Sequence, residues 1–200
     1  MLAALAGTVS CGQVARTGRS PAFLVIDTME AASGAKPGEF GVPLLSDVQT
    51  LVKQTIAGVE QQVPTIYNDL GQASIRLMLK DQGNPGTPSS PSALNQITIT
   101  RYHVDYVRSD GRNTQGVDVP FSYDGGVTAT ITSSPSTVTF ELVRHEAKEE
   151  APLRALIGGG GRIFVSTIAN VTFYGADQAG NDVQATGSIS VNFADFADPQ

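Results

Sequence analysis

The chain has a single cysteine and no tryptophan among its 200 residues, and it has no long apolar run. One cysteine excludes an intramolecular disulfide framework and a cysteine-rich zinc site, so the fold must be stabilised by its own core. No stretch approaches the roughly 18 apolar residues of a spanning helix, which leaves a covalent lipid as the route to a membrane. Basic residues are scarce too. Thirteen against 19 acidic residues give a formal net charge of −6, which opposes nucleic-acid binding because that function needs a basic surface.

The cysteine, Cys11, directly follows an almost wholly apolar segment, residues 1–10. Leucines and alanines form a short apolar core over residues 2–6, and the small residue Ser10 precedes the thiol. This segment resembles the end of a bacterial lipoprotein signal, in which a peptidase cleaves before a cysteine that carries a diacylglycerol. The resemblance covers residues 2–12. It implies that Cys11 is a lipid-attachment site that anchors the protein at the bacterial cell envelope.

Two features of this segment depart from the usual signal. Thr8 stands where an aliphatic residue is usual, and no Lys or Arg precedes Leu2. We therefore expect the natural start to lie upstream of Met1, with a basic segment that completes the signal. Gly12 replaces the Asp that some diderm bacteria use for inner-membrane retention, which by resemblance favours the outer membrane or the periplasm.

Two other interpretations of the amino-terminal segment stay open. Residues 4–6, Ala-Leu-Ala, have the pattern of an ordinary secretory cleavage site, which would leave Cys11 as a free thiol in a secreted protein. Alternatively, residues 1–10 are the plain start of a cytosolic chain. Residues 11–21 have the composition of a flexible tether in front of the folded domain.

The dominant sequence period after residue 21 is two, which is typical of strands. Thr, Val, Ile and Gly are plentiful, and turn residues recur at short intervals. The length of residues 22–197 suits one domain. We therefore predict a single all-β domain, an antiparallel sandwich of about 8–9 strands with one short helix.

Turn and strand signals set the expected bounds of individual elements. A hairpin is expected over residues 44–66, although part of its apolar spacing also fits a helix, and an exposed loop over 83–91. The phase change within 97–107 predicts a β-bulge near Thr100 and Arg101. A strand over Val117 to Tyr123 and a turn at Asp124-Gly125-Gly126 are expected next. Residues 145–157 are the one helical candidate, split by Pro152.

The last predicted hairpin has a distinctive connection. Gly180 and Asn181 readily adopt positive φ, as a tight hairpin requires, and Asp177 can accept hydrogen bonds from nearby amides. Residues 168–193 resemble the last hairpin of bacterial immunoglobulin-like domains, in which an aromatic strand end is followed by a small residue, Asp and then Ala-Gly-Asn. The resemblance implies an immunoglobulin-like antiparallel β-sandwich, and it implies nothing about chemistry.

Residues that could carry chemistry are few. His145 and Glu149 would share a helix face, and His103 could add a third metal ligand, but a solvated charged turn over 144–150 explains the same residues. We therefore predict no metal site and no cofactor. No serine lies in a Gly-x-Ser-x-Gly setting, and Cys11 has no positioned base nearby, so we predict that the protein is not an enzyme.

Two functions fit these observations. The first is a non-catalytic cell-envelope lipoprotein, tethered to a membrane by Cys11, whose loops or sheet edge contact other envelope proteins or glycans. The alternative is a secreted module that binds a glycan or a peptide through loops 83–92 and 111–116. Only the first requires the Cys11 thiol for partitioning into detergent.

Overall fold

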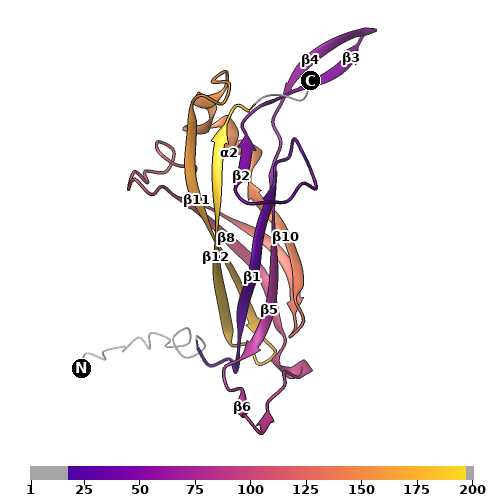
Figure 1. The fold of residues 1–200 in the computed structure, drawn as a ribbon, viewed down its shortest axis with the longest axis vertical. Helices are drawn as coiled ribbons and strands as arrows, with labels where there is room; N and C mark the ends of the chain where they lie inside the picture. Colours follow the sequence, from indigo (N-terminus) through magenta and orange to yellow (C-terminus); the bar gives the residue numbers. More distant parts are fainter. Residues whose placement is uncertain (1–17, 197–200) are drawn as a thin grey trace, which may run out of the picture.

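The computed structural model describes residues 18–196, and most of these residues form strands (Figure 1). Cys11 and the rest of the predicted signal lie outside the described residues. The predicted β class is confirmed. In chain order the strands are β1 (Ala22–Ala32), β2 (Leu44–Asp47), β3 (Thr50–Ile56), β4 (Val59–Thr65), β5 (Asp69–Leu79), β6 (Gly83–Asn84), β7 (Thr87–Pro88), β8 (Ile97–Val107), β9 (Tyr123–Ile131), β10 (Ser136–Val143), β11 (Phe164–Asp177) and β12 (Asp182–Ala194). The helical elements are η1 (Ala93–Asn95), α2 (His145–Glu149) and η2 (Leu153–Leu156).

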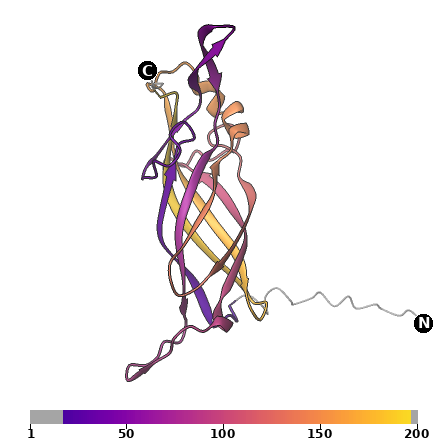
Figure 2. The ribbon, with the colours of Figure 1, turned by 90° about the vertical axis from the view of Figure 1, so that its right-hand side faces the viewer.

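Two sheets make up the body. A three-stranded sheet has the order β1-β5-β10, and a five-stranded sheet has the order β2-β12-β11-β8-β9. Neighbouring strands are antiparallel except for β2 and β12, which pair in parallel. Two hairpins extend the body lengthwise, β3–β4 beyond one end and β6–β7 beyond the other (Figures 1 and 2). No helix among residues 18–196 is long and apolar enough to cross a membrane.

The core lies between the two sheets and is formed by alternate residues of their strands. An aromatic group occupies its middle: the ring of Phe140 lies 5.2 Å from that of Tyr102 and 5.3 Å from that of Phe173. Tyr106 packs against Phe193 and is 1% exposed, so both tyrosines of β8 serve the core. Burying side chains of this size contributes about 1.5–3 kcal/mol each, which provides the core stabilisation that a chain without disulfides needs.

Glycines inside strands make room for this aromatic group. A Cβ at Gly125 would lie 2.2 Å from the Cζ atom of Tyr102, and one at Gly71 would lie 2.5 Å from that of Phe140. The predicted turn at Asp124-Gly125-Gly126 is therefore wrong, because these residues lie within β9. A glycine pair in a strand resembles a turn in the sequence, but here Gly125 admits a ring from the neighbouring strand.

The predicted strand over Val117 to Tyr123 is also wrong. Apart from Tyr123, which begins β9, this segment is a loop with one isolated bridge between Gln115 and Val119. The Asp118 carboxylate accepts from the backbone N–H of Thr114, and Gln115 hydrogen-bonds Ser122. These local contacts satisfy polar groups that a sheet ladder would otherwise pair.

Other local predictions are confirmed. The register of β8 shifts between Ile99 and Arg101 against both neighbouring strands, so Thr100 is the bulged residue. Residues 50–65 form a hairpin, whereas residues 44–47 of the predicted hairpin form β2 and pair with β12, and α2 ends before Pro152. In the last hairpin the positive φ falls on Gly180 (78°) and not on Asn181. Asn181 is held by donating its backbone N–H and its side-chain amide to the carboxylate of Asp177.

Candidate functional site

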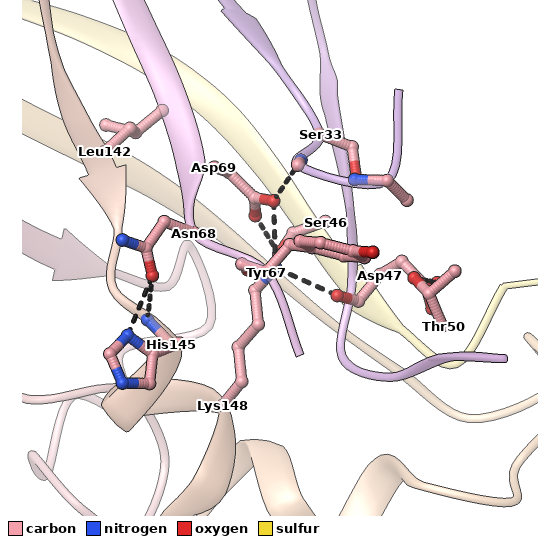
Figure 3. A network of polar contacts seen from close by, with 12 residues as sticks. Ser33, Ser46, Asp47, Thr50, Tyr67, Asn68, Asp69, Leu142, His145 and Lys148 are labelled. Carbon is pink, nitrogen blue, oxygen red and sulfur yellow. Dashed lines mark hydrogen bonds and ion pairs between the residues drawn. The ribbon is translucent and has the colours of Figure 1, made fainter. Parts of the chain in front are cut away.

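The most unusual side chain of the body is Lys148 of α2, whose ammonium group is completely buried (Figure 3). Its Nζ atom donates to Oδ1 of Asp69 at 2.8 Å, to the carbonyl of Tyr67 at 2.8 Å and to the carbonyl of Asp47 at 2.9 Å. An ammonium group has three donors, and all three are used. The three acceptors therefore replace the hydration shell that burial removes.

Asp69, at the start of β5, is equally buried and equally satisfied. Besides Lys148, its Oδ1 accepts from the backbone N–H of Gly34 at 2.9 Å, and its Oδ2 accepts from the Ser46 hydroxyl at 2.5 Å. The ion pair thereby joins α2 to β2, to β5 and to the loop after β1. A buried charge pair is tolerated only with such extra hydrogen bonds, because desolvating each ion costs several kcal/mol.

This network is enclosed within the protein and holds the segments around it in position. Both charged side chains are 0% exposed, so no substrate reaches them. The ammonium donors are spent, and a fully bonded ammonium ion is not a nucleophile. Its hydrogen bonds hold the backbone of Asp47 and Tyr67 in place.

Those two residues stand at the root of the β3–β4 hairpin. Asp47 ends β2 just before the hairpin, and Tyr67 follows it, so one ammonium group binds the chain on both sides. The Thr50 hydroxyl adds a bond of 2.6 Å to the Asp47 carboxylate at the first residue of β3. The hairpin extends from this fixed root beyond the end of the body (Figure 1).

One face of the hairpin is uncharged and largely exposed. Ile56 and Val59 at its tip are 46% and 59% exposed. Among the described residues, β3 and β4 pair only with each other. A two-stranded sheet with unpaired edges and exposed apolar side chains at its tip is typical of an interaction surface. The cross-strand pairs of this face are Val52–Val63, Gln54–Gln61 and Ile56–Val59.

The loops predicted to bind a ligand do not form one site. Residues 83–92 precede η1 and the start of β8, and residues 111–116 follow the end of β8. An 11-residue strand lies between them, which spans about 36 Å at 3.3 Å per residue. The segment 83–92 contains the β6–β7 hairpin, and Asp110 braces the other loop through ion pairs with Arg108 and Arg112.

The residues considered as metal ligands lie in separate settings. His145 Nδ1 lies 2.9 Å from the Asn68 Oδ1 atom, whereas His103 faces the Asp124 carboxylate on the five-stranded sheet. No group of three or more His, Cys, Asp or Glu side chains suited to a metal occurs among residues 18–196.

The carboxylate of Asp177 is committed to the β11–β12 turn. It accepts from the backbone N–H groups of Ala179 and Asn181, each at 2.9 Å. Partial burial by itself would raise the pKa of Asp177, but the hydrogen bonds from Asn181, Ser20 and Ala179 outweigh it and hold this pKa below its ordinary value. The predicted hydrogen bonds from loop amides to this carboxylate are confirmed.

Comparisons with protein-family models, with curated proteins and with solved structures give no match. The function of this chain must therefore be argued from its residues and their geometry.

Proposed function

We propose that this chain is a non-catalytic cell-envelope lipoprotein with an immunoglobulin-like β-sandwich body and a structural or interaction role. The observation that carries the proposal is the position of Cys11, the single cysteine, directly after the apolar segment 1–10. A lipid on that sulfur would hold the body at a membrane through a short tether, residues 11–21.

The direction of β1 supports this arrangement. The strand begins at the end of the body opposite to the β3–β4 hairpin (Figure 1). A tether attached there would leave the hairpin on the side away from the membrane. The uncharged face with Ile56 and Val59 would then be accessible to other envelope components.

The immunoglobulin-like assignment is supported by the two packed sheets and by the last hairpin. Strands β11 and β12 pair over 13 residue pairs, and Asp177 organises their turn through the Ala-Gly-Asn sequence that carries the resemblance. Immunoglobulin-like sandwiches gather their loops at the two ends of the body, where the loops can contact a partner.

The test is the behaviour of Cys11 variants in a bacterial host that carries the complete gene. The unmodified protein should enter the detergent phase on Triton X-114 partitioning, and its mature form should begin at a diacylglyceryl-modified Cys11. Cys11→Ser should move the protein to the aqueous phase, whereas Thr17→Ala in the same tether should leave it in the detergent phase. A wild-type protein that stays aqueous and carries a free thiol contradicts the proposal.

A further inference from the structure

The β-bulge of β8 creates a shallow pocket on the outer face of the five-stranded sheet. Thr100 is the extra residue, and both Thr100 and Arg101 are exposed, which breaks the alternation of the strand. Gly175 of β11 allows the backbones to approach there, because a Cβ at this position would lie 2.3 Å from the Thr98 carbonyl oxygen. Bulges are over-represented next to active sites, where they redirect a side chain or end the strand pairing.

The pocket has a volume of about 490 Å³, within the range of small-molecule sites. One wall is a stack of two side chains, in which the Arg101 guanidinium carbon lies 3.8 Å from the centroid of the Tyr174 ring. The Arg101 Nη1 also donates to Asp124 Oδ1 at 2.9 Å. Ring and carboxylate together hold the guanidinium in one orientation.

Several polar groups of the pocket have unused hydrogen-bonding capacity. Within residues 18–196, no hydrogen bond engages the Asp182 carboxylate, the Gln184 amide or the Tyr174 hydroxyl. Arg101 uses only one of its nitrogens. The pocket thus offers donors and acceptors side by side on three strands, which is the combination that recognises hydroxyl groups, since each hydroxyl both donates and accepts.

The local charge argues for a neutral ligand. Arg101 and Asp182 are the charged residues that line the pocket, and Arg101 is already paired with Asp124 just outside it, so these three side chains together carry a formal charge of −1 in a chain of net charge −6. Phosphates and carboxylates are disfavoured in such a field. The geometry points to a binding site for a neutral saccharide in the bulge pocket, contacted by Arg101, Asp182 and Gln184 next to the Tyr174 ring.

The surface beside the pocket extends this site along the sheet. Pairs of uncharged polar side chains follow Tyr174 on the same face of β11 and β12, each linked by a hydrogen bond of 2.7–2.8 Å. Each pair keeps further donors or acceptors for a ligand. A chain of sugars could lie along this row, so the ligand class is a neutral oligosaccharide. The pairs are Thr172–Thr186, Asn170–Ser188 and Ser166–Asn192, and the Ile168–Ser190 pair, with Ile168 40% exposed, lies between the last two.

The test is titration of the full 200-residue chain with neutral gluco-, galacto-, manno- and N-acetylglucosamine oligosaccharides, followed by backbone amide NMR. At least one of them should bind and shift the amide resonances of Arg101, Tyr174 and Gln184. Arg101→Ala and Gln184→Ala should each weaken that binding about tenfold or more. Thr128→Ala, an exposed position on β9 outside the pocket, is the matched control and should leave binding unchanged.

Three results would overturn the site. One is the absence of shifts with every neutral oligosaccharide in millimolar excess. Another is a preference for oligogalacturonate or sulfated dextran over the neutral sugars. The third is binding that survives Arg101→Ala and Gln184→Ala but is lost in Asn84→Ala, which would place the ligand at loop 83–92. Because the lipid on Cys11 plays no part in the titration, these outcomes leave the lipoprotein proposal to its own experiment.

Discussion

At the end of the body that carries the β3–β4 hairpin, the buried ammonium group of Lys148 holds several chain segments together. Its three hydrogen bonds hold Asp69 and the carbonyls of Asp47 and Tyr67, and the Lys148 and Asp69 side chains are both 0% exposed. Losing one member of such a pair is costly because the other charge stays buried without compensation.

Lys148→Met should therefore lower the free energy of unfolding by about 3–5 kcal/mol, measured by urea unfolding followed by far-ultraviolet circular dichroism. Adding Asp69→Asn should recover part of this loss, because it removes the charge that was left alone. Lys53→Met on the exposed hairpin is the control and should change stability by about 0.5 kcal/mol or less. Equal stability of Lys148→Met and the wild type would show that the ion pair is not the brace described here.

This residue could not be identified from the sequence. Arg144 to Glu150 is a run of charged residues, which usually forms a solvated surface. Lys148 is buried only because α2 packs its side chain against segments 79 and 101 residues away. Long-range packing of this kind leaves no local signal in the chain.

Among the elements, β9 illustrates how a strand is shaped by its neighbours. Gly125 faces the Tyr102 ring, with ring atoms 2.2–2.5 Å from the position of an added Cβ, whereas Gly126 has nothing within 4 Å. Two adjacent glycines thus have opposite environments in one strand.

Gly125→Ala should destabilise the protein by about 1–3 kcal/mol, since a methyl group there forces the aromatic group to move. Gly126→Ala should be neutral or slightly stabilising, because it only restricts the unfolded chain. Thermal unfolding of the two variants side by side measures the difference. If both variants melt together, the close approach of Tyr102 to β9 is wrong.

Comparison of the predicted and observed strands shows which sequence signals were sufficient to locate an element. The sequence pattern predicted the last hairpin, which β11 and β12 form, and the change of phase within residues 97–107, which form β8, located the bulge at Thr100. Where a glycine or a proline served a tertiary contact or a loop, as in residues 117–126, the same local rules gave a wrong boundary. The bulge pocket combines residues of β8, β11 and β12, so only the pairing of these strands brings its side chains together.

For the whole molecule, three buried tyrosines make the free energy of unfolding fall at alkaline pH. Burial raises the pKa of Tyr102, Tyr106 and Tyr123 above the ordinary value of 10. The hydroxyls of Tyr106 and Tyr123 also donate to backbone carbonyls of β10. Ionisation of these phenols would place a negative charge inside the core.

The sign of the effect follows from the two states. An unfolded tyrosine loses its proton near pH 10, and a folded one with a raised pKa keeps it, so the stabilisation is complete below pH 10 and declines as pH rises above it. Urea midpoints should therefore fall between pH 10 and 12. In absorbance titration at 295 nm, the native protein should ionise fewer than its five tyrosines near pH 10, and the urea-unfolded protein all five. Identical curves for the two states would contradict the burial of these rings.

The pairing of β1 with β5 decides how the body would respond to mechanical tension between its two ends. Ala22, where the tether enters, pairs with Leu79 at one end of this ladder, and Ala32 pairs with Leu70 at the other, next to the segment that leads from the hairpin. A pull on the tether and an opposite pull on the hairpin would drag the two strands past each other lengthwise. The hydrogen bonds between β1 and β5 would then bear the force together instead of breaking one after another. The body should therefore resist stretching along its long axis.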